Sequence, residues 1–499
     1  MWAVLLYLKT ILILSTMIFT LIFMGCSDNK NSARKLQYEG QSIMVIVPKL
    51  HADIIVGPIL KYAKVFEKQT GAKIRVVTPG WNDTIKKIDQ SLTDENLHYD
   101  IFVVIAMWNG TLLSKNHIAP IPQEIKEKID WNDVLPIYKE NVLSWNSVAY
   151  GLPYDGDCIN LYYRKDIFED EQNKKSFSEE FGYELHPPKT WKEYIQIASF
   201  FNGWDWDNDG KIEHGNAGFR IKGDVSLLQF FAQAGAYSKH PDDKAYYFDP
   251  DTMKPRIANP GFVAALEDYV KAMEYGPEGM INFAGHDLRN AFVTGEVAMA
   301  LDWADLGIDA VNSPVSVVKE KVGYSQIPAS NEVYNAITKK WDKIFNQVSS
   351  ISGNWMFLVN KESKNRELAF AFAAFMSSAE STQKFIVDSG SGINPSRLSH
   401  FNDASSWIKS GFSQTSARNY LNEISISLSN PNVVFDITIP GAALYYQALD
   451  EYVYQALLKN ITPQEAMNKA SLKWEEITEK LGREKQSQFY KASLNLKKK

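Results

Sequence analysis

Ser-Ile-Met-Val-Ile-Val-Pro at residues 42–48 opens the stretch that decides the fold, because a short apolar run closed by a proline is typical of a buried strand. Two further apolar runs follow, Lys-Ile-Arg-Val-Val at 73–77 and Tyr-Asp-Ile-Phe-Val-Val-Ile at 99–105. Residues 56–69 and 84–92 lie between these runs and carry apolar residues at helical spacing. Strand, helix, strand, helix, strand at these spacings predicts an α/β lobe with a largely parallel sheet.

The chain begins with a sequence typical of export. Lys9 precedes an apolar run that ends at Gly25-Cys26, and residues 27–41 are polar. At ~1.5 Å per residue the run spans about 22 Å, less than a bilayer interior of ~30 Å, so a cleaved signal is favoured over a permanent anchor. The ending resembles the lipobox of bacterial lipoproteins, although Met24 departs from that pattern. The resemblance implies a signal peptide over 1–25, acylation of Cys26 and a flexible tether over 26–41; ordinary secretion and an uncleaved anchor remain alternatives.

The composition limits the classes of partner that the protein can bind. The 499 residues are 45% hydrophobic, enough for more than one core, and the formal net charge is −6. The sequence carries no basic stripe, which argues against nucleic acid as a partner. Cys158 is the only cysteine besides Cys26, so acylation of Cys26 would exclude an intramolecular disulfide.

A second structural unit is predicted further along the chain. Residues 159–163 have the pattern of a strand, and later segments have apolar stripes typical of helices: 262–273, 367–376 and 443–458. Thr462 and Glu465 form a capping-box pattern with Pro463 at the first helical position, which predicts a final helix to about residue 481. We expect residues 486–499 to form a polar tail.

Five segments, in order, resemble one family. They are GLPYDGDCINLYYRKD at 151–166, PKTWKEY at 188–194, FVTGEVAMALDW at 292–303, SKNRELAFAFAAFMS at 363–377, and the pair IPGAALYY at 439–446 and NITPQEA at 460–466. Together they resemble the extracellular solute-binding proteins of bacterial ABC importers, specifically the sugar-binding, maltose-binding-protein-like group. The resemblance spans essentially all of residues 42–480.

The resemblance implies an architecture and a role. The fold would be the two-lobed periplasmic-binding-protein type II fold, with crossings near Gly151, Trp303 and Gly353. One lobe would comprise 42–150 with 304–352, and the other 151–303 with 353–485. The protein would capture a mono- or oligosaccharide between the lobes and deliver it to a membrane permease, as a lipid-anchored monomer facing the periplasm or the cell exterior. A non-sugar solute such as a polyamine, peptide or phosphodiester, and a role as a ligand sensor, remain alternatives.

Candidate cleft residues follow from the chemistry of sugars, which offer hydroxyls for hydrogen bonds and ring faces for stacking. Aromatic residues stand beside polar residues in several predicted loops, and two of them closely follow predicted strands, where ligands gather in α/β lobes. By resemblance, Trp303 and Tyr446 correspond to stacking positions. Ordinary packing roles remain open for all of them. The predicted ligand-binding residues are Trp81, Trp108, Asp155, Asp157, Trp303, Trp355 and Tyr446.

Residues 205–213, Asp-Trp-Asp-Asn-Asp-Gly-Lys-Ile-Glu, form the sharpest local signal. Carboxylates of Asp205, Asp207 and Asp209 at alternating positions can converge on one hard cation, and a glycine at the sixth position permits the sharp turn. The carbonyl of Lys211 and the carboxylate of Glu213 would complete the set. The twelfth position, which is Glu in a full EF-hand loop, is Asn216. The pattern predicts a structural Ca²⁺ site, with a metal-free turn as the alternative.

Catalysis is not predicted. A cell-surface glycoside hydrolase would need only two carboxylates, and with 59 acidic residues such pairs are expected by chance. Cys158 has no histidine nearby in sequence. The chain contains no His-Glu-x-x-His, Gly-x-Ser-x-Gly or phosphate-loop motif. We therefore expect a binding protein without enzymatic activity.

Overall fold

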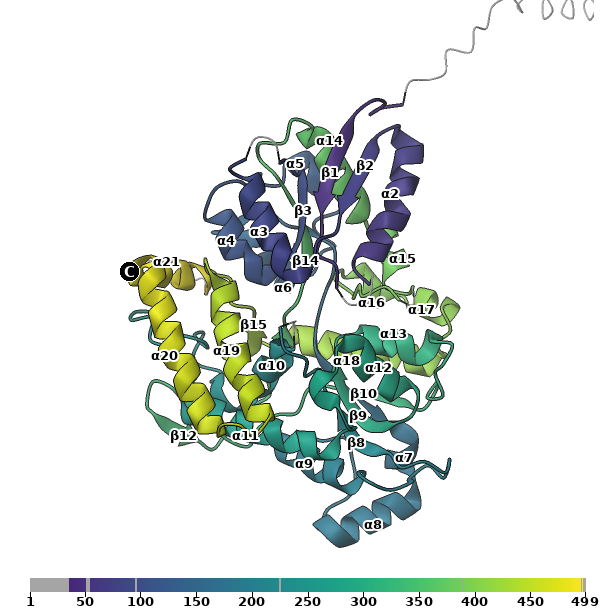
Figure 1. The fold of residues 1–499 in the computed structure, drawn as a ribbon. Helices are drawn as coiled ribbons and strands as arrows, with labels where there is room; N and C mark the ends of the chain where they lie inside the picture. Colours follow the sequence, from purple (N-terminus) through teal and green to yellow (C-terminus); the bar gives the residue numbers. More distant parts are fainter. Residues whose placement is uncertain are drawn as a thin grey trace, which may run out of the picture.

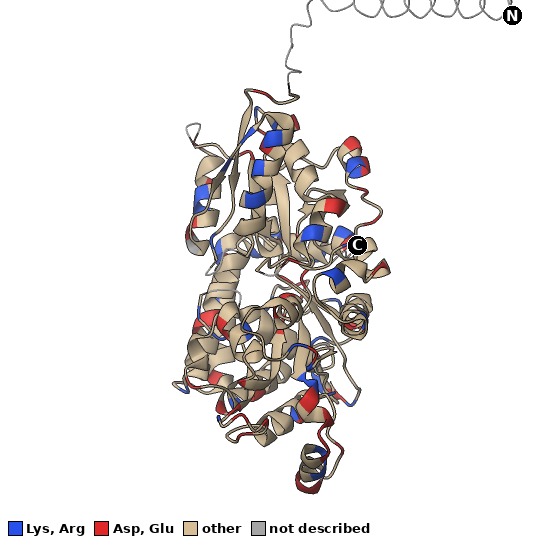
Figure 2. Ribbon diagram, turned by 90° about the vertical axis from the view of Figure 1, so that its right-hand side faces the viewer, with Lys and Arg blue, Asp and Glu red and all other residues tan. Residues whose placement is uncertain are grey.

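A computed structural model of the chain describes residues 36–50, 54–94, 97–223, 226–388, 390–494 and 496. The described residues form two α/β lobes, one above the other in Figure 1, each built around its own sheet. The predicted signal peptide, Cys26 and most of the predicted tether lie outside the described residues. Figure 2 shows Lys and Arg interspersed with Asp and Glu over both lobes.

The first lobe contains a five-stranded sheet in the order β2-β1-β3-β14-β6. The strands predicted at the start of the chain are confirmed as β1 (Ser42–Ile46), β2 (Lys73–Val77) and β3 (Ile101–Ile105), and they pair in parallel. β14 (Trp355–Val359) and β6 (Leu152–Pro153) complete the sheet, with β14 antiparallel to both neighbours. All five residues of β3 and of β14 are buried, which explains their continuous apolar sequence.

Helices cover this sheet. α2 (Val56–Thr70) packs against α14 (Arg366–Met376), and the rings of Phe66 and Phe372 meet with centroids 5.3 Å apart. α2 ends at Gly71, whose φ of 78° suits a glycine cap. The lobe also contains these helices: α3 (Trp81–Ser91), η1 (Ala106–Trp108), α4 (Asn109–Leu113), α5 (Gln123–Lys128), α6 (Pro136–Asn141), α15 (Ala379–Phe385) and α16 (Ser399–Asn402).

The second lobe contains a four-stranded sheet in the order β10-β7-β9-β8. Its strands are β7 (Asn160–Arg164), β8 (His214–Ala217), β9 (Val297–Asp302) and β10 (Val322–Ser325). β7 is antiparallel to both neighbours, and β8 and β9 run parallel. The helices of this lobe up to β10 are α7 (Lys165–Glu169), α8 (Glu171–Phe181), α9 (Trp191–Phe200), α10 (Leu227–Ser238), α11 (Pro260–Ala272), η2 (Met273–Tyr275), η3 (Met280–Asn282), α12 (Gly285–Val293) and α13 (Asp305–Asn312).

The predicted division of the chain between the lobes is wrong for two segments. Residues 304–352 were expected in the first lobe, but β10 pairs with β7 and places them in the second. The segment after residue 353 was expected in the second lobe, but β14 pairs with β3 in the first. Within the described residues the chain therefore crosses between the lobes three times. The first two crossings lie at 154–159 and 352–354. The third lies between Ser399, whose hydroxyl donates to Asp133 in the first lobe, and Trp407, whose ring packs against Tyr420 in the second. Trp303 directly follows β9 of the second sheet and does not mark a crossing.

The C-terminal part completes the second lobe. α19 (Ala442–Leu457) and α20 (Pro463–Leu481) pack side by side, and the predicted capping box between Thr462 and Glu465 is confirmed. The second lobe also contains two smaller strand pairs and two helices. β11 (Val333–Asn335) and β12 (Lys340–Asp342) pair antiparallel, and β13 (Ser349–Ile351) and β15 (Val433–Phe435) pair in parallel. The helices are α17 (Ser405–Lys409) and α18 (Gln414–Ser429). A small hairpin, β4 (Ser144–Trp145) and β5 (Val148–Ala149), lies before the first crossing.

Two segments expected to be polar and unattached are packed instead. The predicted tail largely belongs to α21 (Arg483–Ser493), where Tyr490 is buried and its hydroxyl accepts hydrogen bonds from the backbone N–H groups of Tyr246 and Tyr247. At the other end, Tyr38 is buried and its backbone N–H donates to Thr70. In each segment one buried aromatic side chain, Tyr490 or Tyr38, attaches an otherwise polar sequence to its lobe, which is why both predictions were wrong.

None of the helices among the described residues combines the length and apolar character needed to cross a bilayer. Cys158 is a free, buried thiol, and burial raises its pKa to about 12.

Candidate functional site between the lobes

Three of the predicted tryptophans form one cluster at the edge of the first lobe. Trp81 begins α3 after the turn that follows β2, Trp108 lies in η1 directly after β3, and Trp355 begins β14 opposite Ile105. The ring centroids of Trp81 and Trp108 are 4.8 Å apart, and those of Trp81 and Trp355 are 6.1 Å apart. The carboxyl-terminal ends of β2 and β3 and the amino-terminal end of the antiparallel β14 lie at this edge of the sheet and bring the three rings together, where ligand sites in α/β lobes are expected.

Two of these residues, Trp81 and Trp108, line a cavity of about 550 Å³ between the lobes, which we call the tryptophan cavity. Trp81, Met107 and Trp108 line it from the first lobe, and Leu228, Leu444 and Tyr446 are among its lining residues from the second. The predicted stacking residue Tyr446 thus faces the predicted tryptophans. The wall is mostly apolar and aromatic, which suits the ring face of a sugar.

A second cavity of about 320 Å³ lies beside the crossings, and we call it the hinge cavity. Ile54, Ile105 and Trp355 line it from the first lobe, while Trp303, Arg289 and Asp305 line it from the second. Asp157 and Gly353, which belong to two crossings, complete the part of the wall nearest the hinge. Trp355 lines the hinge cavity and contacts Trp81 of the tryptophan cavity, so the two cavities flank one aromatic cluster.

Trp303 is held by the backbone around it. Its indole Nε1 donates a hydrogen bond of 2.9 Å to the carbonyl of Ser352, and its own backbone N–H donates to Asp302. The residue is only 5% exposed. The ring lines the hinge cavity while most of its surface packs against protein, and its contact with a ligand stays a prediction.

Tyr446 is fixed in a similar way. Its hydroxyl donates to Asp436 Oδ1 at 3.2 Å and accepts from the backbone N–H of Ile437. The other carboxylate oxygen of Asp436 accepts from the N–H of Gly353, which lies in the second crossing with a φ of 90°. Burial raises the pKa of Asp436 to about 6. One buried carboxylate therefore ties a wall of the tryptophan cavity to the crossing.

Asp155 and Asp157 meet at a single asparagine. Asp155 Oδ1 accepts from the backbone N–H of Asn394 at 2.7 Å, and the amide Nδ2 of Asn394 donates to Asp157 Oδ1 at 2.7 Å and to Asp305 Oδ1 at 2.8 Å. Asp157 lines the hinge cavity, whereas Asp155 is fully buried behind it. Asp155 and Asp157 thus belong to a buried acidic cluster, which we call the hinge carboxylates: Asp155, Asp157 and Asp305.

Arg289 of α12 is the cationic group of this cluster. Its Nε donates to Asp302 Oδ2 at 2.6 Å, and its Nη2 lies 2.5 Å from Asp305 Oδ2. Burial raises the pKa of Asp302 to about 6 against the opposing effect of Arg289. Burial, together with the neighbouring carboxylates, also holds the pKa of Asp157 well above its usual range.

Sequence reasoning missed Arg289, Asp305 and Asn394. Asp305 stands three residues after Asp302 and beside Trp303, so the local spacing held a usable signal. Arg289 and Asn394 gave none, because Arg289 reaches Asp302 from α12, across the turn into β9, and Asn394 comes from a segment far away in the chain. Asn394 is 237 residues from Asp157.

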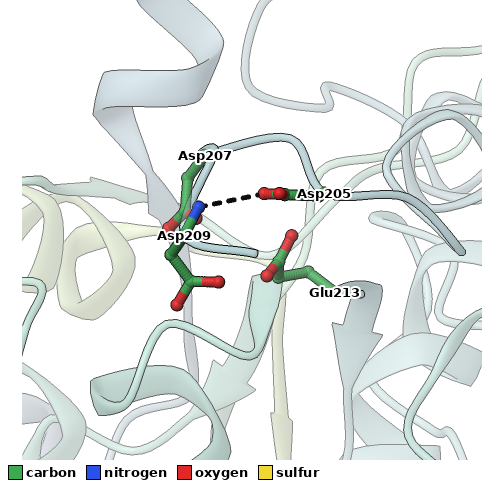
Figure 3. A group of neighbouring side chains, drawn as sticks. All are labelled: Asp205, Asp207, Asp209 and Glu213. Atoms are coloured by element: carbon green, nitrogen blue, oxygen red, sulfur yellow. Dashed lines mark hydrogen bonds between the residues drawn. The ribbon is translucent and has the colours of Figure 1, made fainter. Parts of the chain in front are cut away.

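The acidic loop lies in the second lobe, away from both cavities. Figure 3 shows the side chains of Asp205, Asp207, Asp209 and Glu213 converging on one place, and one oxygen from each lies within 4.8 Å of the others. Asp205 accepts from the N–H groups of Asp209 and Gly210, which shapes the turn. Asn208 and Gly210 have φ values of 61° and 87°.

The charges of this loop are only partly balanced. Arg164 Nη2 contacts Asp207 Oδ2 at 3.2 Å, and Lys211 Nζ contacts Asp209 Oδ2 at 2.5 Å. Asp207 Oδ1 is a buried oxygen with no hydrogen-bond donor. Burial and the three neighbouring carboxylates raise the pKa of Glu213 to about 7, although Trp206 N–H donates to it. A hard cation fits this donor set.

The twelfth loop position does not join the cluster. The amide Nδ2 of Asn216 donates to the carbonyl of Ala272, and the residue lies within β8. Glu213 is therefore the buried carboxylate that closes the loop, four residues after Asp209.

Two α/β lobes, three crossings and aromatic cavities between the lobes define a hinged solute-binding protein. Comparison with known proteins gives the family: residues 61–410 match the bacterial extracellular solute-binding proteins, and the chain belongs to that family. The predicted family and fold class are confirmed.

Individual relatives are distant. The chain is 22% identical over 348 residues to a protein of Sinorhizobium fredii named as a probable amino-acid ABC transporter periplasmic-binding protein, covering 68% of this chain and 69% of the relative. It is 22% identical over 359 residues to a mannitol-binding protein of Pseudomonas aeruginosa, covering 71% and 73%. Its fold is similar to that of an ABC transporter solute-binding protein from Agrobacterium radiobacter in complex with ribitol, with a TM-score of 0.69, 18% identity, and coverage of 88% and 99%.

Proposed function

We propose that this protein captures a sugar or sugar alcohol between its lobes and delivers it to an ABC permease. The observation that carries the proposal is the pair of inter-lobe cavities: Trp81, Trp108 and Tyr446 line one, and Trp303 lines the other beside two hinge carboxylates, Asp157 and Asp305. Ring faces and carboxylates together match the two kinds of surface that a polyhydroxylated ring or chain presents. The ligands named for the mannitol-binding and ribitol-bound relatives belong to this class.

Capture would follow from hinged closure. A solute that contacts both lobes stabilises the closed arrangement by its greater affinity for that state. The protein would act as a monomer and without chemistry, and the permease subunits would use the ATP.

A thermal-shift screen tests this role. A ligand that binds only the folded protein raises the melting midpoint once its concentration exceeds its dissociation constant. We expect ribitol, D-mannitol, maltose or another sugar of the panel to raise the midpoint and to be recovered unchanged after prolonged incubation. Shifts only with peptides or linear polyamines would contradict sugar capture, and consumption of a sugar would show an enzyme.

We also propose that the mature protein is a lipoprotein anchored through Cys26, on the strength of the lipobox-like sequence described above. In cells that express the full chain, the protein is expected in the membrane fraction. Cys26→Ser removes the acylated thiol and is expected to prevent that association. Equal membrane association of the variant would contradict lipid anchoring.

The acidic loop is proposed to hold a structural Ca²⁺. Four carboxylates within 4.8 Å of one another, one of them with a buried oxygen that lacks a donor, form an arrangement that one hard cation neutralises. Nothing in the loop faces either inter-lobe cavity, so the ion would stabilise the second lobe without contacting the solute.

A further inference from the structure

The hinge cavity has more acidic than basic groups on its wall. Among the described residues that line it, Asp157, Asp305 and Asp309 supply carboxylates, whereas Arg289 is the only Lys or Arg. Arg289 is already shared between Asp302 and Asp305. His286 also lines the cavity, and its Nε2 lies 3.1 Å from Asp287 Oδ1. The lining therefore carries more carboxyl groups than basic side chains.

A further carboxyl group, that of Asp155, lies directly behind the cavity wall. Asp155 is 4% exposed, and its Oδ2 is buried without a hydrogen-bond donor. Asn394 is the donor that the hinge carboxylates share, and its amide is neutral. A buried carboxylate oxygen without a donor is costly, and burial together with the neighbouring Asp305 favours protonation of Asp155.

Aromatic rings face the same space. Trp303 and Trp355 line the hinge cavity together with Asp157, and neither ring is paired with a Lys or Arg in the described structure. An ammonium group is attracted both to carboxylates and to the face of an indole ring. Carboxylates beside indole rings on one cavity wall therefore discriminate between a cationic and a neutral solute.

We propose that the natural solute carries a protonated amine, as an amino sugar does, and that this amine binds in the hinge cavity between Asp157 and Asp305. This inference rests on the proposed function, because it assigns the chemical class of the sugar held between the lobes. The hydroxyls and the ring of the solute contact the aromatic walls, and the ammonium donates to the hinge carboxylates. Charge-assisted hydrogen bonds of this kind are about twice as strong as neutral ones.

Binding should then release protons. Burial and the neighbouring Asp305 raise the pKa of Asp155 to about 8, so the protonated form of this carboxyl is favoured at pH 7 in the solute-free protein. A cation in the cavity favours the ionised form, and the displaced proton leaves to the solvent. A neutral sugar at the same place causes no such release.

The test compares matched pairs of probes. Titration calorimetry at pH 7 measures the affinities for glucosamine, galactosamine, mannosamine and the disaccharide of glucosamine, each against its neutral hydroxyl counterpart. We expect at least one amino sugar to bind about tenfold or more tightly than its counterpart, with heats in two buffers of different ionisation enthalpy showing proton release. Equal or tighter binding of every neutral counterpart, or no binding of any amino sugar at millimolar concentration, would overturn the inference.

The binding results distinguish a failure of the amine inference from a failure of the proposed function. A neutral sugar that binds while amino sugars do not overturns only the amine inference. Absence of binding by both classes overturns sugar capture as well.

Variants locate the amine. Asp305→Asn and Asp157→Asn preserve shape and remove charge, and each should bring the affinity ratio of amino to neutral sugar close to one. Asp309 lies at the same wall and is only partly buried, so Asp309→Asn is the variant to use if the others fold poorly; it should lower the ratio by severalfold. Asp242→Asn, at a side chain 92% exposed on the second lobe, is the matched control. Unchanged ratios in all three cavity variants would contradict the assignment.

Discussion

The indole of Trp303 donates a 2.9 Å hydrogen bond to the carbonyl of Ser352, the residue at which the chain leaves the second lobe for the first. One side chain thus anchors a crossing and also forms part of the hinge cavity wall. A substitution at Trp303 therefore affects both solute binding and folding stability, and comparing two variants of this residue separates the two effects.

Trp303→Ala should impair both properties. Removing a buried aromatic ring costs about 3–5 kcal/mol of unfolding free energy, and losing a stacking surface should weaken solute binding by about tenfold or more. Trp303→Phe keeps a ring and loses only the hydrogen bond to Ser352, so it should retain most of the affinity. Denaturant unfolding and titration calorimetry on the two variants provide the check. Wild-type affinity in Trp303→Ala would show that the ring contacts no solute.

Gly110→Ala should hold the lobes apart. A Cβ at Gly110 of the first lobe would lie 2.1 Å from the carbonyl oxygen of Thr438 in the second, a distance that no side chain tolerates. The variant should therefore bind solute at least tenfold more weakly, with little loss of stability because each lobe keeps its own core. Small-angle scattering should show a larger radius of gyration than the wild type. A wild-type radius and affinity would contradict the close contact between these segments.

Calcium should stabilise the protein through the acidic loop. A structural ion that binds only the folded state raises the melting midpoint, so a chelator should lower it in the wild type. Asp207→Asn removes one ligand charge while Arg164 keeps its ion pair with Asp166, and the variant should show a much smaller difference between calcium and chelator.

The calcium experiment has its own control. Asp242→Asn removes an exposed carboxylate of the same lobe and should respond to chelator as the wild type does. A wild-type midpoint indifferent to the chelator would contradict a calcium site in this loop.

The solute-free protein should become less stable as the pH rises from about 5 to 8. Burial raises the pKa of Asp155 to about 8 and those of Asp302 and Asp436 to about 6, whereas an unfolded aspartate titrates near 3.9. The folded state therefore binds more protons in this window, and its stabilisation at low pH is lost as each carboxylate ionises. Melting midpoints between pH 4 and 9 measure the trend.

Asp155→Asn tests the main source of that trend. The amide keeps an acceptor for the N–H of Asn394 and does not titrate, so the slope of the midpoint against pH should become shallower. An equally steep slope in the variant would assign the pH dependence to other groups.

The sequence predicted most of the elements because their apolar periodicity is local. The strands around Val45, Val76 and Val103 and the helix that begins at Pro463 were all predicted close to their observed positions. The grouping of elements into lobes was partly wrong, since a buried apolar strand such as β14 looks the same whichever sheet it joins, and only pairing decides.

The site was predictable where local chemistry marks it. Trp81 and Trp108 closely follow strands, and Asp205, Asp207 and Asp209 alternate along one loop. The local sequence therefore predicted that the members of each group lie close together. Of the hinge carboxylates, Asp155 and Asp157 were predicted and Asp305 was not. Asn394 joins them from 237 residues away, and Arg289 joins Asp305 from α12, so neither contact leaves a pattern in the local sequence.

Titration calorimetry with the sugar or sugar alcohol that gives the largest thermal shift tests most directly whether solute binds between the lobes. We predict one saturable site per chain, with affinity at least tenfold weaker in Trp303→Ala and in Gly110→Ala and unchanged in Asp242→Asn. Binding that all three variants retain at wild-type strength, or no binding by any sugar, would contradict the account.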